Sequence, residues 1–177
     1  MSAKSADRKT EQLVVTALMM CLILVGTIVF RIPIPMTQGY VHLGDAMIFL
    51  GVLLLGKKSG ATAAGLGSAM ADVLGGFAVW APWTLVIKAA MAYSAGALID
   101  HSRSGGKSLS HGAAAAAMAV GGLIMTAGYY VAEGIMYGSW GAALIGIPWN
   151  IGQFVVGIVL SVAIYTATGK FGRSLKD

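Results

Sequence analysis

The run Gln12-Leu-Val-Val-Thr-Ala-Leu-Met-Met-Cys-Leu-Ile-Leu-Val-Gly-Thr-Ile-Val-Phe30 contains no charged side chain. About 20 apolar residues let a helix cross the ~30 Å hydrocarbon core of a bilayer, and this run approaches that length. It exceeds the apolar core of about 7–15 residues that a cleaved signal peptide carries. The stretch therefore predicts a transmembrane helix that is retained in the protein.

Similar apolar runs fill most of the remaining chain. Of the 177 residues, 57% are hydrophobic and only 11% are charged, and the mean hydropathy is +0.79. These values predict one membrane domain over residues 1–177, without a soluble domain. The expected fold class is an all-α integral membrane protein, a bundle of six transmembrane helices. The predicted helices cover about residues 12–30, 44–56, 60–79, 84–99, 112–137 and 148–168.

Basic residues separate and flank these runs in a regular way. They precede the first helix, join the second to the third and the fourth to the fifth, and follow the sixth. These residues are Lys4, Arg8, Lys9, Lys57, Lys58, Arg103, Lys107, Lys170, Arg173 and Lys176. Because positive residues favour the cytoplasmic side, both termini are expected in the cytoplasm. The net charge of +5 is thereby assigned to membrane topology, and no nucleic-acid partner is expected.

Four ionisable residues lie inside the apolar runs: Asp45, Asp72, Lys88 and Glu133. A charge at membrane depth costs roughly 2.5–3.5 kcal/mol on insertion scales, so such residues usually face a bundle interior or a water-filled cavity. Asp72 and Lys88 are placed to approach across the hairpin of predicted helices three and four. The two residues are interpreted as a buried ion pair, or alternatively Lys88 points into a cavity and binds a solute there. Asp45 is either a carboxylate at a helix N-terminus or a support for the preceding loop.

Aromatic and amide residues add to this polar set near the predicted outer side. Tyr130 and Glu133 share a helix face by their spacing, which suits either a clamp for a flat ring or an interfacial position. Asn150 and Gln153 share a face of the last helix and serve either ligand binding or helix packing. Trp149 belongs either to an interfacial aromatic belt or to the wall of a site.

Motifs for catalysis are not apparent in the sequence. Gly51-Val-Leu-Leu-Leu-Gly-Lys-Lys58 comes close to a phosphate-binding loop, but lysine stands where the hydroxyl residue is required and the run is a membrane helix. Cys21 is the one cysteine and has no disulfide or metal-ligand spacing. We therefore expect no enzyme activity and no bound cofactor in this chain.

Three runs resemble the substrate-binding (S) components of energy-coupling factor (ECF) vitamin transporters. They are Gly39-Tyr-Val-His-Leu-Gly-Asp45, Ser68-Ala-Met-Ala-Asp-Val-Leu-Gly-Gly76 and Ala81-Pro-Trp-Thr-Leu-Val-Ile-Lys88. The group most resembled handles hydroxymethylpyrimidine or pyridoxine. The resemblance implies a multi-pass protein of a prokaryotic cell membrane that binds a vitamin from outside. It also implies partners, a transmembrane coupling (T) component and two cytoplasmic ATPases that use ATP and Mg, with Ala17 and Cys21 docking to the T component.

The resemblance also implies a set of binding residues. They are Tyr40, His42, Lys88, Tyr130, Glu133, Trp149, Asn150 and Gln153. Asp45 and Asp72 match the family runs and are interpreted as structural. Two alternatives remain open at this stage: an S component for pantothenate, riboflavin or cobalamin, and a stand-alone ion-coupled carrier of small solutes.

Overall fold

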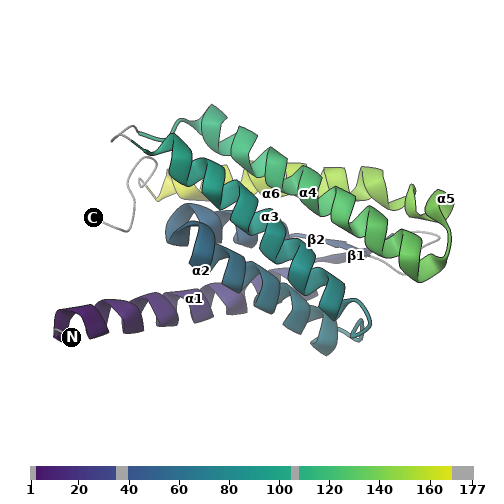
Figure 1. Ribbon diagram of the computed structural model, residues 1–177, viewed down its shortest axis with the longest axis horizontal. Coiled ribbons are helices and arrows are strands. Elements are labelled where there is room, and N and C mark those ends of the chain that lie inside the picture. Colours follow the sequence, from purple (N-terminus) through teal and green to yellow (C-terminus); the bar gives the residue numbers. More distant parts are fainter. Residues whose placement is uncertain (1–2, 35–39, 105–107, 169–177) are drawn as a thin grey trace.

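The computed structural model describes residues 3–34, 40–104 and 108–168 (Figure 1). Its elements, in chain order, are α1 (Ala3–Val29), β1 (Arg31–Pro33), β2 (Tyr40–His42), α2 (Gly44–Leu74), α3 (Ala81–Ser102), α4 (His111–Tyr137), α5 (Trp140–Ala143) and α6 (Gly146–Ala167). Five helical segments are long and apolar enough to cross a membrane: 7–29, 44–74, 81–102, 111–137 and 140–167. The lengths and composition of these helices are therefore those of a multi-pass membrane protein.

A sharp bend divides α2 at Gly56. The backbone there has φ 74° and ψ −178°, outside the helical region, and glycine adopts a positive φ without the steric cost of a Cβ. A Cβ added at Gly60 would lie 3.0 Å from the Cα of Val52, although eight residues of straight helix would separate them by ~12 Å. The chain therefore turns back on itself at the break predicted between residues 56 and 60. The six-helix count and the cytoplasmic termini stay predictions.

Helix boundaries differ from the predicted ones around residue 80. The predicted helix 60–79 ends at Leu74, and the predicted turn Trp80–Trp83 is instead the start of α3. Pro82 occupies the first turn of that helix, where its missing N–H costs no hydrogen bond. The proline that suggested a turn is in fact a helix start.

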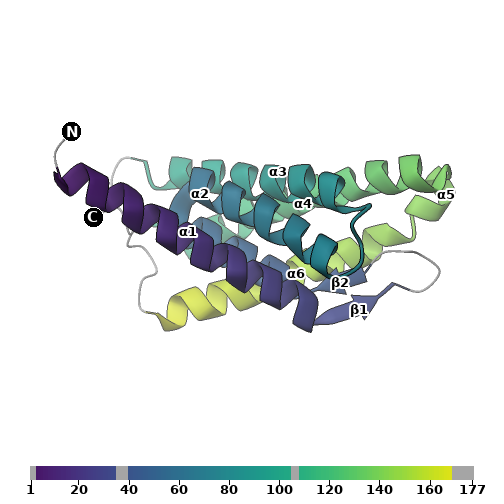
Figure 2. The ribbon, with the colours of Figure 1, turned by 90° about the horizontal axis from the view of Figure 1, so that it is seen from below.

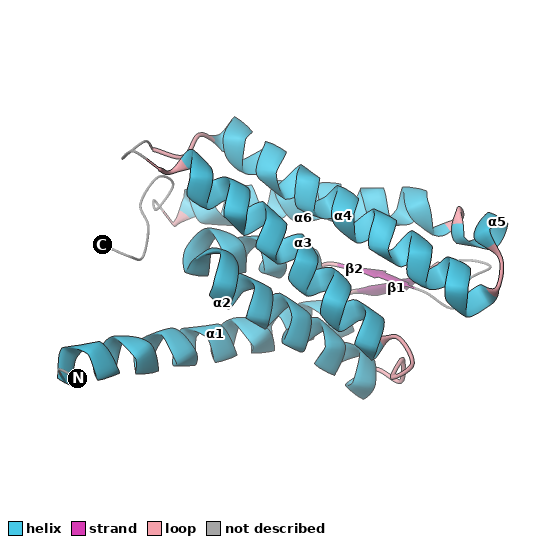
Figure 3. Ribbon diagram, viewed as in Figure 1, coloured by secondary structure: helices cyan, strands magenta, loops and turns pink. Residues whose placement is uncertain are grey.

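A two-stranded hairpin lies between α1 and α2, so the all-α prediction was incomplete (Figure 3). Its strands pair antiparallel, with Arg31 opposite His42 and Pro33 opposite Tyr40. Strands of three residues are too short to show an alternating pattern in the sequence. The hairpin and α5 lie at one end of the molecule, and the start of α1 and the end of α6 lie at the other (Figures 1 and 2).

Close helix packing surrounds α2, which contacts α1, α3 and α6. Ile23, Phe49, Met91 and Met118 are among the fully or almost fully buried side chains of this core. Between α3 and α4, a Cβ at Gly121 would lie 2.6 Å from the carbonyl oxygen of Met91. Small residues let membrane helices approach this closely, which explains the abundance of glycine in the chain. The predicted topology residues Lys107, Lys170, Arg173 and Lys176 lie outside the described residues.

Candidate functional site

A polar cavity lies where the hairpin meets five helices of the bundle, α1, α2, α3, α4 and α6. Its volume is about 40 Å³, compared with the ~30 Å³ that one molecule occupies in liquid water. The cavity is lined by Thr27, Ile34, Tyr40, His42, Ser68, Asp72, Trp80, Thr84, Tyr129, Glu133, Asn150 and Gln153. Residues from distant parts of the sequence therefore converge on one small space.

Four buried polar atoms along this lining have no hydrogen-bond partner among the described residues. They are Thr27 Oγ1, Ser68 Oγ, Asp72 Oδ2 and Glu133 Oε2. Buried polar atoms in folded proteins are almost always hydrogen-bonded, so each exception calls for an explanation. Since all four residues line the same cavity, a polar ligand there would satisfy them together.

Glu133 extends from α4 toward the start of α6, and its side chain is 3% exposed. A Cβ at Gly146 would collide with both oxygens of this carboxylate. The absence of a side chain at Gly146 therefore makes room for Glu133. One turn later, Asn150 donates from Nδ2 to the carbonyl oxygen of Gly146 at 3.1 Å.

Asp72 fixes the second strand of the hairpin to the bundle. The Tyr40 hydroxyl donates to Asp72 Oδ1, and burial, reinforced by the Asp72 carboxylate, raises the pKa of Tyr40 above its usual value. The hydroxyl therefore stays protonated and remains a donor. The guanidinium of Arg31 lies 4.5 Å from the Tyr40 ring centroid and donates to the carbonyl oxygen of Gly75 at 3.1 Å.

Two hydrogen bonds hold His42 in place, one through its ring and one through its backbone N–H. The backbone N–H of Gly44 donates to His42 Nδ1 at 3.0 Å, so the neutral ring carries its proton on Nε2. Burial lowers the pKa of His42 to about 3, and the nearby Lys88 ammonium acts in the same direction. The backbone N–H of His42 donates to Gln153 Oε1 at 2.9 Å, which ties the hairpin to α6.

A buried ion pair between Lys88 and Asp45 lies next to Gln153. Lys88 Nζ is 2.5 Å from Asp45 Oδ1, and both side chains are fully buried. Gln153 Nε2 donates to the other oxygen of Asp45 at 2.8 Å, and Lys88 Nζ also approaches Met125 Sδ at 2.8 Å. The partner of Lys88 is thus Asp45, whereas the sequence suggested Asp72, because the two ends of the bent α2 face different parts of α3.

Comparison with known proteins identifies the family of this chain. The family model described as "ECF-type riboflavin transporter, S component" matches residues 7–170. The chain belongs to the S components of ECF transporters. A solved structure described as "Structure and mechanism of the S component of a bacterial ECF transporter" shares the fold, with a TM-score of 0.74 and 16% identity over 93% of this chain and 99% of that one.

Two curated proteins are similar in sequence to this S component. One, from Lactococcus lactis subsp. cremoris (strain MG1363), is named "Thiamine precursor transporter HmpT" and is 30% identical over 88% of this chain and 86% of its own length. The other, from Pyrococcus woesei, is described as an uncharacterized protein in the gap 3' region. It is 36% identical over 86% of this chain and 93% of its own length.

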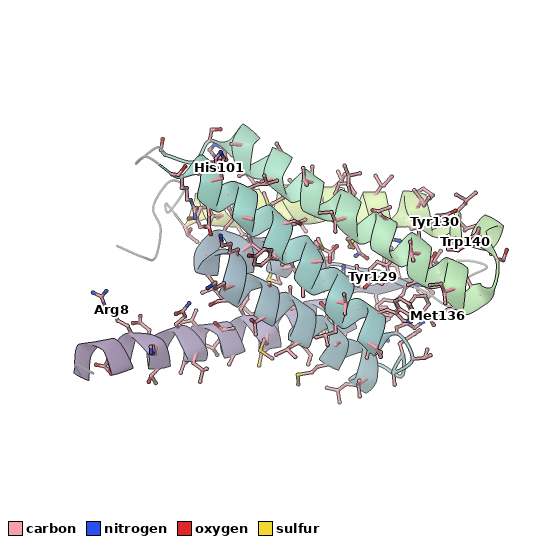
Figure 4. The ribbon with its side chains drawn as sticks, viewed as in Figure 1. Arg8, His101, Tyr129, Tyr130, Met136 and Trp140 are labelled. Atoms are coloured by element: carbon pink, nitrogen blue, oxygen red, sulfur yellow. The ribbon has the colours of Figure 1, made fainter. Side chains whose placement is uncertain are left out.

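The S component brings five of the eight predicted binding residues to the cavity: Tyr40, His42, Glu133, Asn150 and Gln153. Lys88 is instead paired in the core, Tyr130 packs against Trp140 with ring centroids 5.6 Å apart (Figure 4), and Trp149 is 40% exposed. Trp149 lines a neighbouring apolar groove of about 570 Å³. The roles of all eight residues in binding stay predictions.

Sequence reasoning missed most of the remaining lining. The sequence pattern does not single out six of these residues and assigns Asp72 to structure; the six are Thr27, Ile34, Ser68, Trp80, Thr84 and Tyr129. A usable signal existed in two places. Ser68 and Asp72 are four residues apart, as are Tyr129 and Glu133, so each pair shares a helix face.

Ala17 and Cys21 are exposed on α1 of the S component. The same helix exposes Leu18, Leu22 and Val25, so the two small residues lie within an apolar surface. Their docking role stays a prediction. In the described ranges, no group of three or more His, Cys, Asp or Glu side chains is arranged to hold a metal ion.

The Asp45–Lys88 pair predicts a large effect of removing one partner. Lys88→Met leaves the buried Asp45 carboxylate without its countercharge and should lower the free energy of unfolding by about 3–5 kcal/mol. Asp45→Asn combined with Lys88→Met should recover at least half of that loss. The control is Lys57→Met, which removes a partly exposed pair 4.0 Å long with Asp100 and should cost less than about 1 kcal/mol. Thermal unfolding in detergent measures all three, and an unchanged Lys88→Met protein would contradict the assignment.

His42 predicts a pH dependence of stability. Its folded pKa of about 3 lies below the value of ~6.5 in an unfolded chain, so the unfolded state binds the extra proton between these values. Its contribution is complete above pH ~6.5 and falls as the pH drops, by about 2 kcal/mol between pH 7 and pH 5. His42→Gln should flatten this slope in thermal unfolding, and His101→Gln, at an exposed position, should leave it intact. Equal slopes for wild type and His42→Gln would show that His42 is not buried in its neutral form.

Proposed function

We propose that this S component binds a small single-ring vitamin precursor of the hydroxymethylpyrimidine type. The observation that carries the proposal is the cavity in which four buried polar atoms lack partners among the described residues. Ligand sites of this kind combine aromatic walls with a few convergent polar groups. Here the aromatic part of the lining is Tyr40, Trp80 and Tyr129.

The size of the cavity favours one ring over several. With a volume of about 40 Å³, the cavity suits a single six-membered ring better than a larger ring system. A three-ring flavin or a corrin would require a far larger rearrangement. The name of the Lactococcus lactis relative, a thiamine precursor transporter, supports the same choice, since hydroxymethylpyrimidine is the ring precursor of thiamine.

Uptake requires an energy source outside this chain. The sequence lacks a phosphate-binding loop, and membership of the S-component family supports a division of labour. We assign the coupling to a T component in the cell membrane of a prokaryote and to two cytoplasmic ATPases. The ligand enters from the outer side, at the end of the bundle where the hairpin lies.

Two adjacent tyrosines test the location of the site. Tyr129 lines the cavity, whereas Tyr130 packs against Trp140. Tyr129→Leu should weaken binding of hydroxymethylpyrimidine at least tenfold, on the order of 1.4 kcal/mol, because it removes an aromatic wall. Tyr130→Leu should change the affinity less than about twofold. Isothermal titration of the purified protein in detergent measures both.

Equal losses in the two variants would place the site elsewhere, and a wild-type protein that binds no hydroxymethylpyrimidine would reject the ligand class. Flux measurements in vesicles provide the control for energy coupling. The chain alone should give no uptake, and uptake should require the T component, both ATPases and ATP. Gradient-driven uptake by the chain alone would support the ion-coupled carrier instead.

A further inference from the structure

Two acidic side chains line the cavity, and no basic side chain among the described residues faces them. Asp72 and Glu133 both line it and are each 3% exposed. The described lining contains no lysine or arginine. A ligand in this cavity therefore meets carboxylates without a facing cation.

The two nearest cations, Lys88 and Arg31, do not line the cavity. Lys88 is bonded to Asp45 beneath the cavity. Arg31 lies against the rings of Tyr40 and Phe77 and donates to Gly75, and it lines the neighbouring groove rather than the cavity. Neither is placed to bind an anionic ligand alongside Glu133.

The groups left for a ligand include two carboxylate oxygens. Glu133 Oε2 and Asp72 Oδ2 have no partner within the described part of the chain. One N–H of the Asn150 amide donates to the Gly146 carbonyl, which leaves its second N–H as a donor and its side-chain oxygen as an acceptor. The backbone N–H of His42 and the amide nitrogen of Gln153 are likewise occupied.

The two acids differ in how free they are. Asp72 already accepts the Tyr40 hydroxyl, and the Thr84 hydroxyl lies beside the same carboxylate. Glu133 Oε2 has no hydrogen-bond partner among the described residues, and its carboxylate lies against Gly146, where no side chain intervenes. Glu133 is therefore the acid that a ligand reaches without displacing a protein donor.

We propose that Glu133 is the specificity-determining residue of the cavity and accepts a hydrogen bond from an N–H group of the ligand ring. This deepens the proposed function, on which it rests, by naming the ligand chemistry: a neutral or protonatable amino-substituted ring. A charge-assisted hydrogen bond to a buried carboxylate is among the stronger polar interactions. A ring that presents a carbonyl oxygen at the same position would instead face the carboxylate acceptor to acceptor, and an anionic ligand would be repelled.

A matched pair of ligands tests this inference. One is hydroxymethylpyrimidine, whose ring carries an exocyclic amine, and the other is the analogue in which a carbonyl oxygen replaces that amine. Isothermal titration of the wild-type protein should show the amino compound bound at least about 100-fold more tightly, because sites built around a hydrogen bond strongly reject analogues that lack it. Glu133→Gln should reduce this ratio to less than about tenfold, since an amide offers a donor as well as an acceptor.

Glu11→Gln is the matched control, because Glu11 is an exposed glutamate on α1 away from the cavity lining. It should keep the wild-type ratio. Equal affinity of the wild-type protein for both ligands would overturn the inference while the proposed function stands, and binding of neither would reject the proposed function itself. A Glu133→Gln protein that keeps the full ratio would show that another group selects the amine. The wild-type comparison needs no variant, so the inference stays testable if Glu133→Gln fails to fold.

Discussion

The architecture depends on how one buried charge is neutralised. Lys88 is fully buried within an apolar bundle and is 2.5 Å from Asp45. An ion taken out of water is tolerated only with a close countercharge and further hydrogen bonds. Gln153 supplies one of these bonds to Asp45 and accepts another from the backbone of His42. The pair thereby connects α2, α3 and α6 to the hairpin. It also contacts Gln153, which lines the cavity.

The polar groups of the molecule divide into two kinds. Asp45 and Lys88 are paired with each other, and these side chains stabilise the fold. Glu133 and Asp72, which line the cavity, each have a carboxylate oxygen without a partner in the described part of the chain. Unsatisfied buried groups reduce stability, and their concentration in one place is best understood as the preparation of a ligand site.

Much of the fold could be predicted from the sequence because membrane spans depend on length and hydropathy. The apolar runs, the break near Gly56 and the start of the last helix are features of this kind. The hairpin could not be predicted, since three-residue strands carry no period and Pro33 masks one of them. The partner of Lys88 also depends on the bend in α2, which determines whether Asp45 or Asp72 reaches α3.

The candidate site was predicted in part for a similar reason. Glu133, Asn150 and Gln153 were identifiable because polar residues inside apolar helices are costly and therefore informative. Aromatic residues give no such signal, and the helix phase of Tyr129 and Tyr130 differs by 100° per residue. Because the two side chains point in directions about 100° apart, Tyr129 lines the cavity and Tyr130 packs against Trp140. Only the packed structure distinguishes these two positions.

The central claim is that the cavity, rather than the larger apolar groove beside Trp149, holds the ligand. A structure of the protein determined with hydroxymethylpyrimidine bound tests it most directly. The account predicts the ring in contact with Tyr129, with a ring amine about 2.7–3.2 Å from the Glu133 carboxylate. Density for the ligand in the groove lined by Trp149 and Pro148, with Glu133 left without a partner, would contradict it.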